Sequence, residues 1–278
     1  MRQISNRRVQ RSQLRTQSYK LIVRSKNHSC SSLRNICVPC RTILRLGSTT
    51  PTSVIDKGRG KTYFEINSPE ACKISGNKIL MKQKFINAGV KTAEYFTLNN
   101  RYSLVSVKRY FNRFGTIIAK KKDSCKGNGI YLLENFNDFK TFAVGKDVTQ
   151  FVFEKYYNYN KEYRLHISKN GCFYTCRKML KRDAIDRWHR HDSNSIWVLE
   201  ENPQFNKPNN WDLIVSDCVK ALNAVGLDIG AFDVKCETNT PNPDWIILES
   251  NSAPALGELG VQKYEQEIKR LCSQISAV

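Results

Sequence analysis

The sequence predicts a mixed α/β protein, because short β-rich runs alternate with segments of helical periodicity along much of the chain. Two alternating apolar runs meet at Asn170-Gly171, the dipeptide that most strongly indicates a β-hairpin. Residues 211–225 instead carry apolar side chains three and four positions apart, which is the stripe of an amphipathic helix. With 278 residues and 40% hydrophobic side chains, the chain can bury a sizeable core in roughly two domains.

Composition argues against a membrane-spanning or secreted protein. No run of about 18 consecutive apolar residues is present, and the N-terminal stretch lacks the apolar region of a secretory signal. The ten cysteines are mostly scattered singly, which is typical of reduced thiols rather than of a disulfide framework. We therefore expect a cytoplasmic globular protein without a membrane partner.

The formal charge of +20 is concentrated towards the N-terminus. Residues 1–61 contain fourteen Lys or Arg residues and a single acidic residue, Asp56. A surface of this kind attracts phosphate backbones and other polyanions. Residues 1–18 are therefore interpreted either as a flexible, solvated arm or as a contact for a polyanion such as nucleic acid.

His28, Cys30, Cys37 and Cys40 raise a separate question about metal binding. These four side chains could supply zinc ligands, and Cys37 and Cys40 form a CxxC pair. Their spacing is cramped for the two ligand pairs of a structural zinc site, and it lies beside a candidate strand. Ordinary thiols are the favoured interpretation, and zinc is the alternative.

The order of the elements predicts four regions. Residues 1–18 are the arm, and residues 19–62 form a reduced N-terminal α/β domain. Residues 63–148 form a central subdomain, and residues 149–278 form a C-terminal subdomain that carries a metal site. In the N-terminal domain, β-rich runs at 19–25 and 41–50 leave room for one short helix between them.

Helix boundaries are marked at the start of the central subdomain. Asn67 or Ser68 can cap a helix that begins at Pro69, and Lys78 begins a second helix that ends at Gly89. The residues expected to face the core from the second helix are Ile79, Phe85 and Ile86.

From residue 104 onward, strand-like and turn-like segments alternate. The expected strands lie at 115–121, 129–135 and 149–157, followed by the hairpin at 162–180. Two later runs, 229–237 and 244–250, should pair across a Pro-containing turn, and a final helical pattern covers 261–275.

Three oxygen-bearing side chains occur at the two late strands. Asp233 follows Phe232 in the first strand, and Glu249 and Asn251 end the second, two positions apart and therefore on one face. Magnesium prefers oxygen ligands and is commonly completed by waters and nucleotide phosphates. Asp233, Glu249 and Asn251 therefore predict a nucleotide–metal site.

A second pattern is a lysine followed by a glycine-bearing loop. Lys120 leaves an apolar strand, and the loop with Gly127 and Gly129 returns into another strand. Backbone amides in such a loop can approach phosphate oxygens while the lysine supplies a point charge. A plain hairpin is the alternative. Gly60-Lys61-Thr62 lacks the earlier glycine of a P-loop and is interpreted as a basic turn.

These features follow a characteristic order over roughly residues 65–260: Lys78, Lys120 with its glycine loop, FVFEKYYNYNKEYRL, Arg177, Asp233 and LESNSAP. This order resembles the ATP-grasp superfamily, and is most similar to its glutathione-synthetase and ribosomal-protein glutamate-ligase (RimK-like) branch. In that branch one lysine begins the helix after NSPEA…NK, and another stands seven residues before the first glycine of the phosphate loop. Lys78, and Lys120 with Gly127, match both positions.

The resemblance implies a fold of two α/β subdomains that clasp ATP, and it implies roles for individual residues. Adenine would meet Glu154 and the backbone of Lys155 and Tyr156, and the ribose hydroxyls would meet Glu162. Arg164 and Arg177 would lie near the reacting phosphoryl and carboxylate groups. The metal ligands would be Asp233, Glu249 and Asn251, holding two Mg²⁺ ions, with Mn²⁺ as an alternative.

The activity implied is that of an ATP- and Mg²⁺-dependent carboxylate–amine ligase that acts through an acyl phosphate and releases ADP and phosphate. Its partners would be a carboxylate substrate and an amine acceptor, either a small molecule or a protein terminus. Two alternatives are a kinase of the same fold that phosphorylates a hydroxyl, and a nucleic-acid-associated protein with this scaffold. Residues 181–210, which include Arg187, Trp188, His189 and His191, are expected to form a lid or substrate loop.

Overall fold

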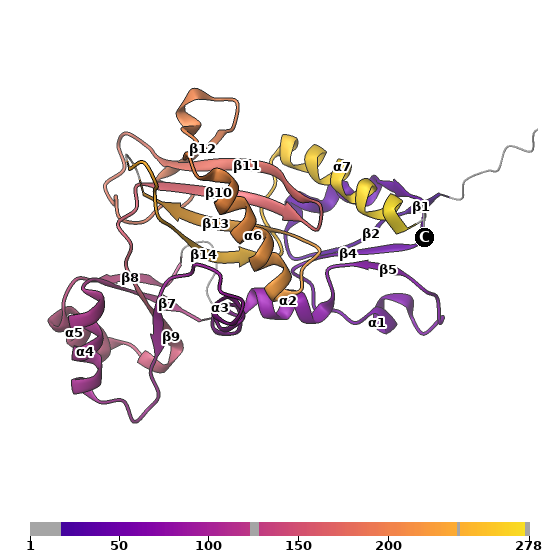
Figure 1. Cartoon of the computed structure of the whole chain (residues 1–278). Coiled ribbons are helices and arrows are strands. Elements are labelled where there is room, and N and C mark those ends of the chain that lie inside the picture. The colour runs from indigo at the N-terminus through magenta and orange to yellow at the C-terminus, as the bar shows by residue number, and fades with distance from the viewer. Residues whose placement is uncertain (1–17, 123–127, 238–239, 276–278) are drawn as a thin grey trace, which may run out of the picture.

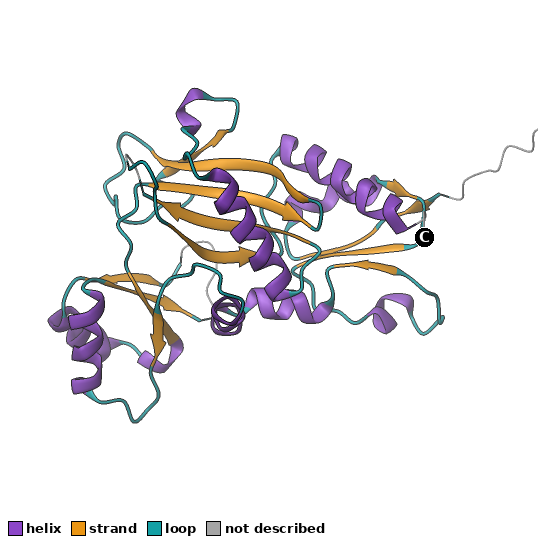
Figure 2. Ribbon diagram, in the orientation of Figure 1, coloured by secondary structure: helices purple, strands orange, loops and turns teal. Residues whose placement is uncertain are grey.

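The computed structural model describes residues 18–122, 128–237 and 240–275. The basic arm predicted at residues 1–18 lies outside the described residues except for Ser18. The described chain forms one two-stranded sheet and three larger sheets, with helices packed on them (Figures 1 and 2). Within these ranges, no helix has both the length and the apolar character needed to cross a membrane.

The N-terminal unit is a small parallel sheet. Its strands are β2 (Ile22–Ser25), β4 (Thr42–Leu46) and β5 (Phe64–Ile66), with β4 in the centre. The expected short helix between the first two is a 3₁₀ helix, η1 (His28–Asn35). The remaining elements of the unit are β1 (Tyr19–Lys20), β3 (Cys37–Val38) and α1 (Thr52–Asp56).

The last helix, α7 (Glu258–Ile275), packs on this N-terminal unit (Figure 1). Tyr264 and Ile268 of α7 are fully buried in one cluster with Leu33 and Leu44. Tyr264 also packs against the rings of His166 and Phe173 in the later hairpin. Helix α7 therefore lies between the N-terminal unit and the C-terminal strands, and the assignment of residues 149–278 to a single C-terminal subdomain stays a prediction.

A second unit is a four-stranded antiparallel sheet in the order β6-β9-β7-β8. Its elements are β6 (Tyr95–Thr97), α4 (Leu104–Phe114), β7 (Ile117–Lys121), β8 (Ile130–Leu133), α5 (Phe136–Gly145), η2 (Val148–Gln150) and β9 (Phe151–Lys155). Because β9 pairs with both β6 and β7, this unit extends to Lys155. The expected division at residue 148 would separate β9 from its own sheet.

Two helices of this unit, α4 and α5, were not expected from the sequence. Helix α4 is rich in Val, Tyr and Phe, residue types that favour strands, but Val107, Phe111 and Phe114 recur at helical spacing and are buried. Helix α5 begins with a capping box formed by Asn135 and Asp138. Both helices pack their aromatic side chains on the four-stranded sheet.

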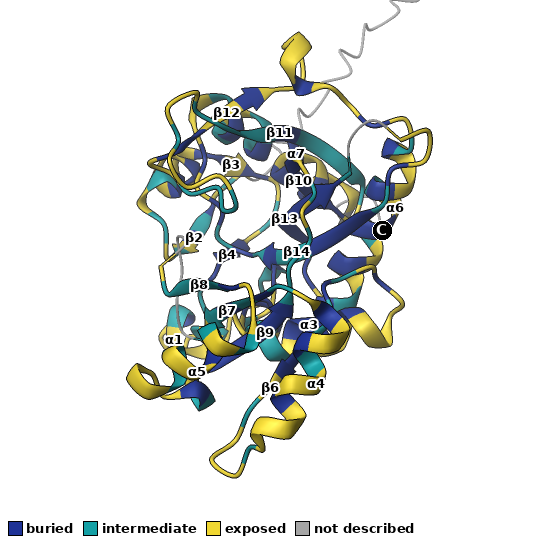
Figure 3. Ribbon diagram, turned by 90° about the vertical axis from the view of Figure 1, so that its left-hand side faces the viewer, coloured by how far each residue is buried: buried dark blue, intermediate teal, exposed yellow. Residues whose placement is uncertain are grey.

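The largest sheet has five antiparallel strands in the order β12-β11-β10-β13-β14. They are β10 (Lys161–Ser168), β11 (Gly171–Leu180), β12 (Ser195–Leu199), β13 (Ile229–Cys236) and β14 (Trp245–Asn251), with η3 (Pro203–Phe205) and α6 (Trp211–Val225) in the connection. The predicted hairpin at Asn170-Gly171 is confirmed, with Gly171 at φ +106°. The predicted pairing of the two late strands is also confirmed. Buried residues concentrate in β10, β13 and β14 (Figure 3).

Three helices pack against this sheet, and their sequence-predicted ends are largely confirmed. Helix α2 (Pro69–Gly76) has Ser68 as its N-cap, and α6 ends at Gly226 in the left-handed conformation. Helix α3 (Lys78–Asn87) begins at Lys78 as expected. The prediction that Ile86 faces the core is wrong, since Ile86 is 54% exposed. The buried side chains of α3 are those of Met81, Lys82 and Phe85.

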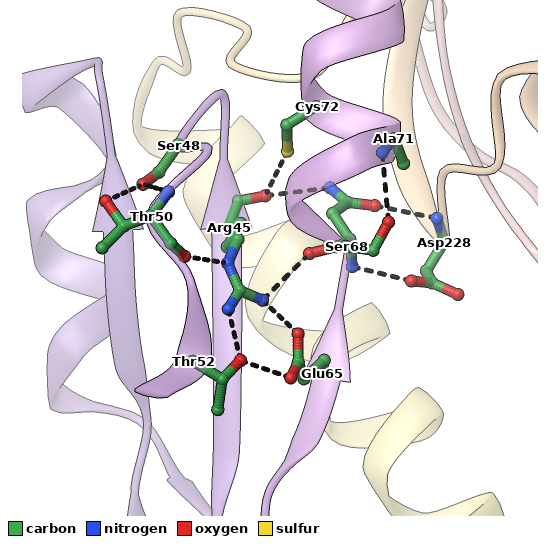
Figure 4. Close-up of polar contacts among 10 residues, drawn as sticks. Arg45, Ser48, Thr50, Thr52, Glu65, Ser68, Ala71, Cys72 and Asp228 are labelled. Atoms are coloured by element: carbon green, nitrogen blue, oxygen red, sulfur yellow. Dashed lines mark hydrogen bonds and ion pairs between the residues drawn. The ribbon is translucent and has the colours of Figure 1, made fainter. Parts of the chain in front are cut away.

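Asn67 joins the N-terminal unit to the five-stranded sheet. It is fully buried in the left-handed region (φ 63°), where asparagine is tolerated. Its side-chain amide donates to the carbonyls of Arg45 and Ile229, and its Oδ1 accepts from the backbone N–H groups of Asp228 and Ile229. Figure 4 shows Asp228 on one side of this junction and Arg45, bonded to Thr52 and Glu65, on the other.

We expect Asn67→Ala to destabilise the protein by at least about 2 kcal/mol, because it leaves buried backbone donors and acceptors without partners. The free energy of unfolding from urea titration measures this loss. The matched control is Asn137→Ala on the exposed surface of α5, which should change that free energy by about 0.5 kcal/mol or less. Equal stability of Asn67→Ala and the parent protein would contradict a junction role for Asn67.

Candidate active site

The register of the five-stranded sheet brings the predicted metal ligands onto one face. Asp233 of β13 lies opposite Glu249 of β14, and Ala231 lies opposite Asn251. Residues directly opposite one another share a face of the sheet, so Glu249 and Asn251 face the same side as Asp233. The other face carries Phe232 and packs against α3 and α6.

Arg164 of β10 lies beside Asp233 in the next strand. Its Nε and Nη2 donate to the two carboxylate oxygens of Asp233 at 2.6 and 2.7 Å, a bidentate pair. Burial alone would raise the pKa of Asp233, but the charge and hydrogen bonds of Arg164 lower it overall. Asp233 is therefore held as an oriented carboxylate.

Glu249 lies in a different electrostatic environment from Asp233. Burial, and then the negative charge of Asp233, raise the pKa of Glu249, while the positive charges of Lys120 and Arg164 oppose this rise. Two neighbouring carboxylates of this kind are stabilised when a cation binds between them. The raised pKa therefore fits a carboxylate that awaits a positive charge.

A cluster of lysines approaches the carboxylates from the four-stranded sheet and α3. Lys120 of β7 pairs with Glu154 of β9 through Nζ and Oε2 at 2.8 Å. Lys82 of α3 contacts the other oxygen of Glu154 at 3.4 Å. Lys78, one turn earlier on α3, is half-buried and donates to the carbonyl of Lys122. Sequence reasoning found Lys78, Lys120 and Glu154 but missed Lys82.

Glu162 occupies the same polar face, next to Lys235 of β13. Burial raises the pKa of Glu162, and the charges of Lys235 and Arg190 oppose that rise. Arg190 approaches the Glu162 carboxylate at 3.6 Å. Burial lowers the pKa of Lys235 to about 8, against the opposing effect of Glu162. Glu162 is thus a buried acid with Lys235 and Arg190 as its basic neighbours. Neither of these two residues was predicted from the sequence.

The backbone expected to meet adenine is partly engaged elsewhere. The N–H of Lys155 donates to the carbonyl of Glu94 at 2.9 Å, and the N–H of Tyr156 donates to the carbonyl of Thr116 at 2.9 Å. These two amide donors therefore serve the four-stranded sheet. The side chain of Tyr156 lies near the polar face, with Lys235 Nζ 5.0 Å from its ring centroid.

The segment after β11 contributes to the same site. His189 is partly buried, and burial followed by the charges of His191 and Lys178 lowers its pKa to about 4, so the ring is neutral near pH 7. Together with Arg190, which contacts Glu162, His189 places this segment beside the polar face. The lid or substrate loop stays a prediction. The rest of the expected loop differs, because residues 195–199 form the edge strand β12.

Arg177 is the one predicted catalytic residue that lies away from this face. It is opposite Tyr163 in the sheet, and Tyr163 is buried beneath α6 on the apolar side. Its Nη1 donates to the carbonyl of Gln204 at 2.6 Å, and its guanidinium lies over the Tyr163 ring. Successive residues in a strand point to opposite faces, so the next residue, Lys178, faces the site instead.

Lys178, rather than Arg177, lies beside the acids of the polar face. Its side chain is 12% exposed, and its charge acts on both Asp233 and Glu162. Its Nζ lies 5.3 Å from the ring centroid of Trp197, which is 41% exposed and also lies over Arg164. The sequence contains the alternation that separates Lys178 from Arg177, but it does not reveal which face of β11 is polar.

The predicted phosphate loop can be described only at its end. Gly127 lies outside the described residues. Gly129 has φ +68°, a conformation that favours glycine, and its carbonyl accepts from the N–H of Lys121 at 2.9 Å. The loop therefore returns into β8 beside the strand that carries Lys120, as the pattern predicted.

The residues at the site fit magnesium better than zinc. In the part of the chain that the structure describes, no three His, Cys, Asp or Glu side chains lie close enough together to form a metal-binding group. His28, Cys30, Cys37 and Cys40, the alternative zinc ligands, therefore do not form one either. Magnesium commonly uses only one or two carboxylates together with waters and phosphates. Asp233 and Glu249 supply that pair. The Asn251 side-chain oxygen, which accepts from the N–H of Ala253 at 2.9 Å, has a second lone pair.

Comparison with known proteins gives matches in structure but none in sequence. No protein-family model matches the chain, and a search of curated proteins returned no match. A D-alanine–D-alanine ligase from Bacillus anthracis superposes with a TM-score of 0.59 at 13% identity, covering 83% of this chain and 75% of that one. D-alanyl-alanine synthetase A from Vibrio cholerae gives 0.59 at 17% identity, with 84% and 73% covered.

A third similar structure is the ATP-grasp ligase PsnB complexed with a minimal precursor, Mg and ADP. It superposes with a TM-score of 0.57 at 15% identity and covers 91% of this chain and 83% of that one. The B. anthracis ligase is also known as a complex with ATP. The RimK-like branch stays a prediction. The topology of the sheets and these superpositions together establish that this chain has the ATP-grasp fold.

Proposed function

We propose that the protein is an ATP- and Mg²⁺-dependent carboxylate–amine ligase. The observation that carries the proposal is that Asp233, Glu249, Arg164 and Lys178 share one face of the five-stranded sheet, and that Lys120 of the four-stranded sheet acts on the charge of Glu249. The negative phosphates of a nucleoside triphosphate complement the lysines and the arginine, and a divalent cation complements the two carboxylates. The ATP, ADP and Mg in the similar ligase structures support the same assignment.

The residues divide the chemistry between them. Asp233, Glu249 and Asn251 would hold Mg²⁺, which would neutralise phosphate charge as the reaction proceeds. Lys78 and Lys120 would bind phosphate oxygens, and Arg164 keeps Asp233 ionised and oriented. Glu162 would accept hydrogen bonds from the ribose. Charge stabilisation by preorganised cations is commonly the largest contribution to such a transfer.

The reaction takes place in two steps that conserve atoms and charge. A carboxylate oxygen of the substrate attacks the γ-phosphorus of ATP, and the bond to the β-phosphate oxygen breaks, which gives an acyl phosphate and ADP. The amine of the acceptor then attacks the acyl carbon, loses a proton, and expels phosphate to leave an amide. Lys178 and Arg164 would stabilise the oxyanion of the second step, with Lys178 in the place that the resemblance implied for Arg177.

The experiment that tests the proposal is a screen for ADP release over amino acids and candidate carboxylates, followed by mass measurement of the product. An amide product with one ADP and one phosphate released per bond supports the ligase. A product that retains the phosphoryl group on a hydroxyl would instead identify the kinase alternative. Absence of ATP binding to the purified protein would reject both.

We expect Mg²⁺ affinity to weaken as the pH falls. The folded-state pKa of Glu249 is raised, so this carboxylate becomes protonated at a higher pH than an ordinary glutamate, whose pKa is about 4.3. Protonation removes a metal ligand, whereas the lowered pKa of Asp233 keeps that residue ionised further into the acid range. Mg²⁺ titrations from pH 8 down to pH 4, in the presence of an ATP analogue and in parallel for Glu249→Gln, measure the effect. An affinity that falls with pH equally in both proteins would contradict ligation by Glu249.

A further inference from the structure

Glu154 is a buried carboxylate that lies between two lysines on different elements. Lys120 of β7 and Lys82 of α3 each contact one of its two oxygens, at 2.8 and 3.4 Å. The side chains of Glu154 and Lys82 are 3% and 1% exposed, and that of Lys120 is 12% exposed. The carboxylate of Glu154 therefore has two lysine partners, one on each oxygen.

The two lysines are held differently. Lys82 Nζ also donates to Thr92 Oγ1 at 3.3 Å, and that hydroxyl donates to the carbonyl of Ile247 in β14 at 2.8 Å. Lys82 is thus connected through Thr92 to the strand that carries Glu249. Its Nζ also lies 5.8 Å from the ring centroid of Tyr95. These contacts position Lys82 away from solvent and on the inner side of Glu154.

Lys120 is more exposed than Lys82, with 12% of its side chain exposed against 1%. Besides Glu154, the groups that act on its charge are the acids Glu249 and Glu162. The proposed function requires Lys120 to exchange its carboxylate partner for phosphate oxygens when the nucleotide binds. Such an exchange would leave Glu154 without a counterion unless a second cation stayed in place, and an unpaired buried charge is strongly unfavourable.

We propose that Lys82 is a positioning residue that remains the counterion of Glu154 when Lys120 transfers to the phosphates of the nucleotide. The inference rests on the proposed function, because it assumes that ATP binds beside Lys120. Lys82 itself contacts no reacting atom.

Lys82→Met tests the proposal through nucleotide binding. We expect the Kd for Mg–ATP, measured by titration calorimetry, to rise about tenfold or more, because Lys120 then stays with Glu154. In steady state the KM for ATP should rise similarly, while kcat at saturating ATP changes less than about threefold, since the chemical step is untouched. Lys82→Arg should restore most of the affinity. The matched control is Lys84→Met, an exposed lysine on the same helix, which should leave Kd unchanged.

A double-mutant cycle separates this role from simple packing of α3. In a Glu154→Gln background there is no carboxylate to compensate, so adding Lys82→Met should have no further effect on the Kd for Mg–ATP. The double variant also removes both buried charges, which keeps the test usable if Lys82→Met alone folds poorly. An equal loss of affinity in both backgrounds would overturn the proposal.

The outcome for this inference is distinguishable from the outcome for the proposed function. A wild-type protein that does not bind Mg–ATP rejects the proposed function itself. A wild-type protein that binds Mg–ATP, together with a Lys82→Met variant of unchanged Kd and KM, rejects only the role of Lys82. A fall in kcat with unchanged KM would also reject it, because that result would place Lys82 in the chemical step.

Discussion

Glu249→Gln is expected to lower Mg²⁺-dependent ATP turnover by about 10³-fold or more. The substitution keeps the shape of the side chain but removes the charge of one of the two carboxylates on the polar face. A catalytic metal ion is commonly worth several kcal/mol of transition-state stabilisation, and 1.36 kcal/mol corresponds to a factor of ten in rate. ADP release measured over a range of Mg²⁺ concentrations gives both the rate and the metal dependence.

The same variant should fold at least as stably as the parent protein. Burial and the adjacent charge of Asp233 raise the pKa of Glu249, so its ionised form is disfavoured in the folded state and costs stability near pH 7. Removing that charge therefore relieves repulsion, while Arg164 keeps its bidentate pair with Asp233. The control is Glu201→Gln, an exposed position. Full activity in Glu249→Gln, or loss of activity in the control, would remove the metal assignment.

The second large effect is expected at Lys178, in contrast with its neighbour Arg177. Lys178→Met should lower kcat/KM by about 10²–10³, the usual consequence of losing one group that stabilises developing negative charge. Arg177→Met should change turnover only a few-fold, because its guanidinium lies on the apolar face and bonds to the carbonyls of Gln204 and Phe205. Steady-state kinetics on both variants, with the same substitution at adjacent positions, provide a matched comparison.

Arg177→Met should affect stability more than activity. It leaves two carbonyl groups near η3 without their charged donor, which we expect to cost about 1–3 kcal/mol, measurable by urea unfolding. The reverse pattern, with turnover lost in Arg177→Met and kept in Lys178→Met, would show that the reaction takes place on the other face of the sheet. It would also contradict the assignment of Asp233 and Glu249 to that reaction.

Local sequence patterns were sufficient to predict the elements whose structure depends on residues close together in the chain. The hairpin at Asn170-Gly171 depends on two residues of turn geometry, and α6 depends on an apolar stripe that ends at Gly226. The pairing of β13 with β14 follows from their β-rich runs and the short connection between them. These elements also determine the position of the carboxylates, so Asp233, Glu249 and Asn251 could be grouped from spacing alone.

Other features depend on contacts between segments that are distant in the sequence. Helix α4 contains β-favouring residues, and its helical form is decided by the burial of Val107, Phe111 and Phe114 on the four-stranded sheet. Because β9 pairs with β6 and β7, the four-stranded unit extends past residue 148, where the sequence predicted a boundary. Helix α7 packs between the N-terminal unit and β11, because its buried apolar residues contact both.

The sequence by itself therefore determined the hairpin, the two late strands and the oxygen-bearing side chains that these strands carry, because these follow from residue type and period. Only the tertiary structure decided which face of β11 is polar, and so selected Lys178 over Arg177. It also decided that Lys82 lies buried against Glu154. A charged side chain on an amphipathic helix is ordinarily solvated, and its burial becomes favourable only when another element brings a carboxylate to meet it.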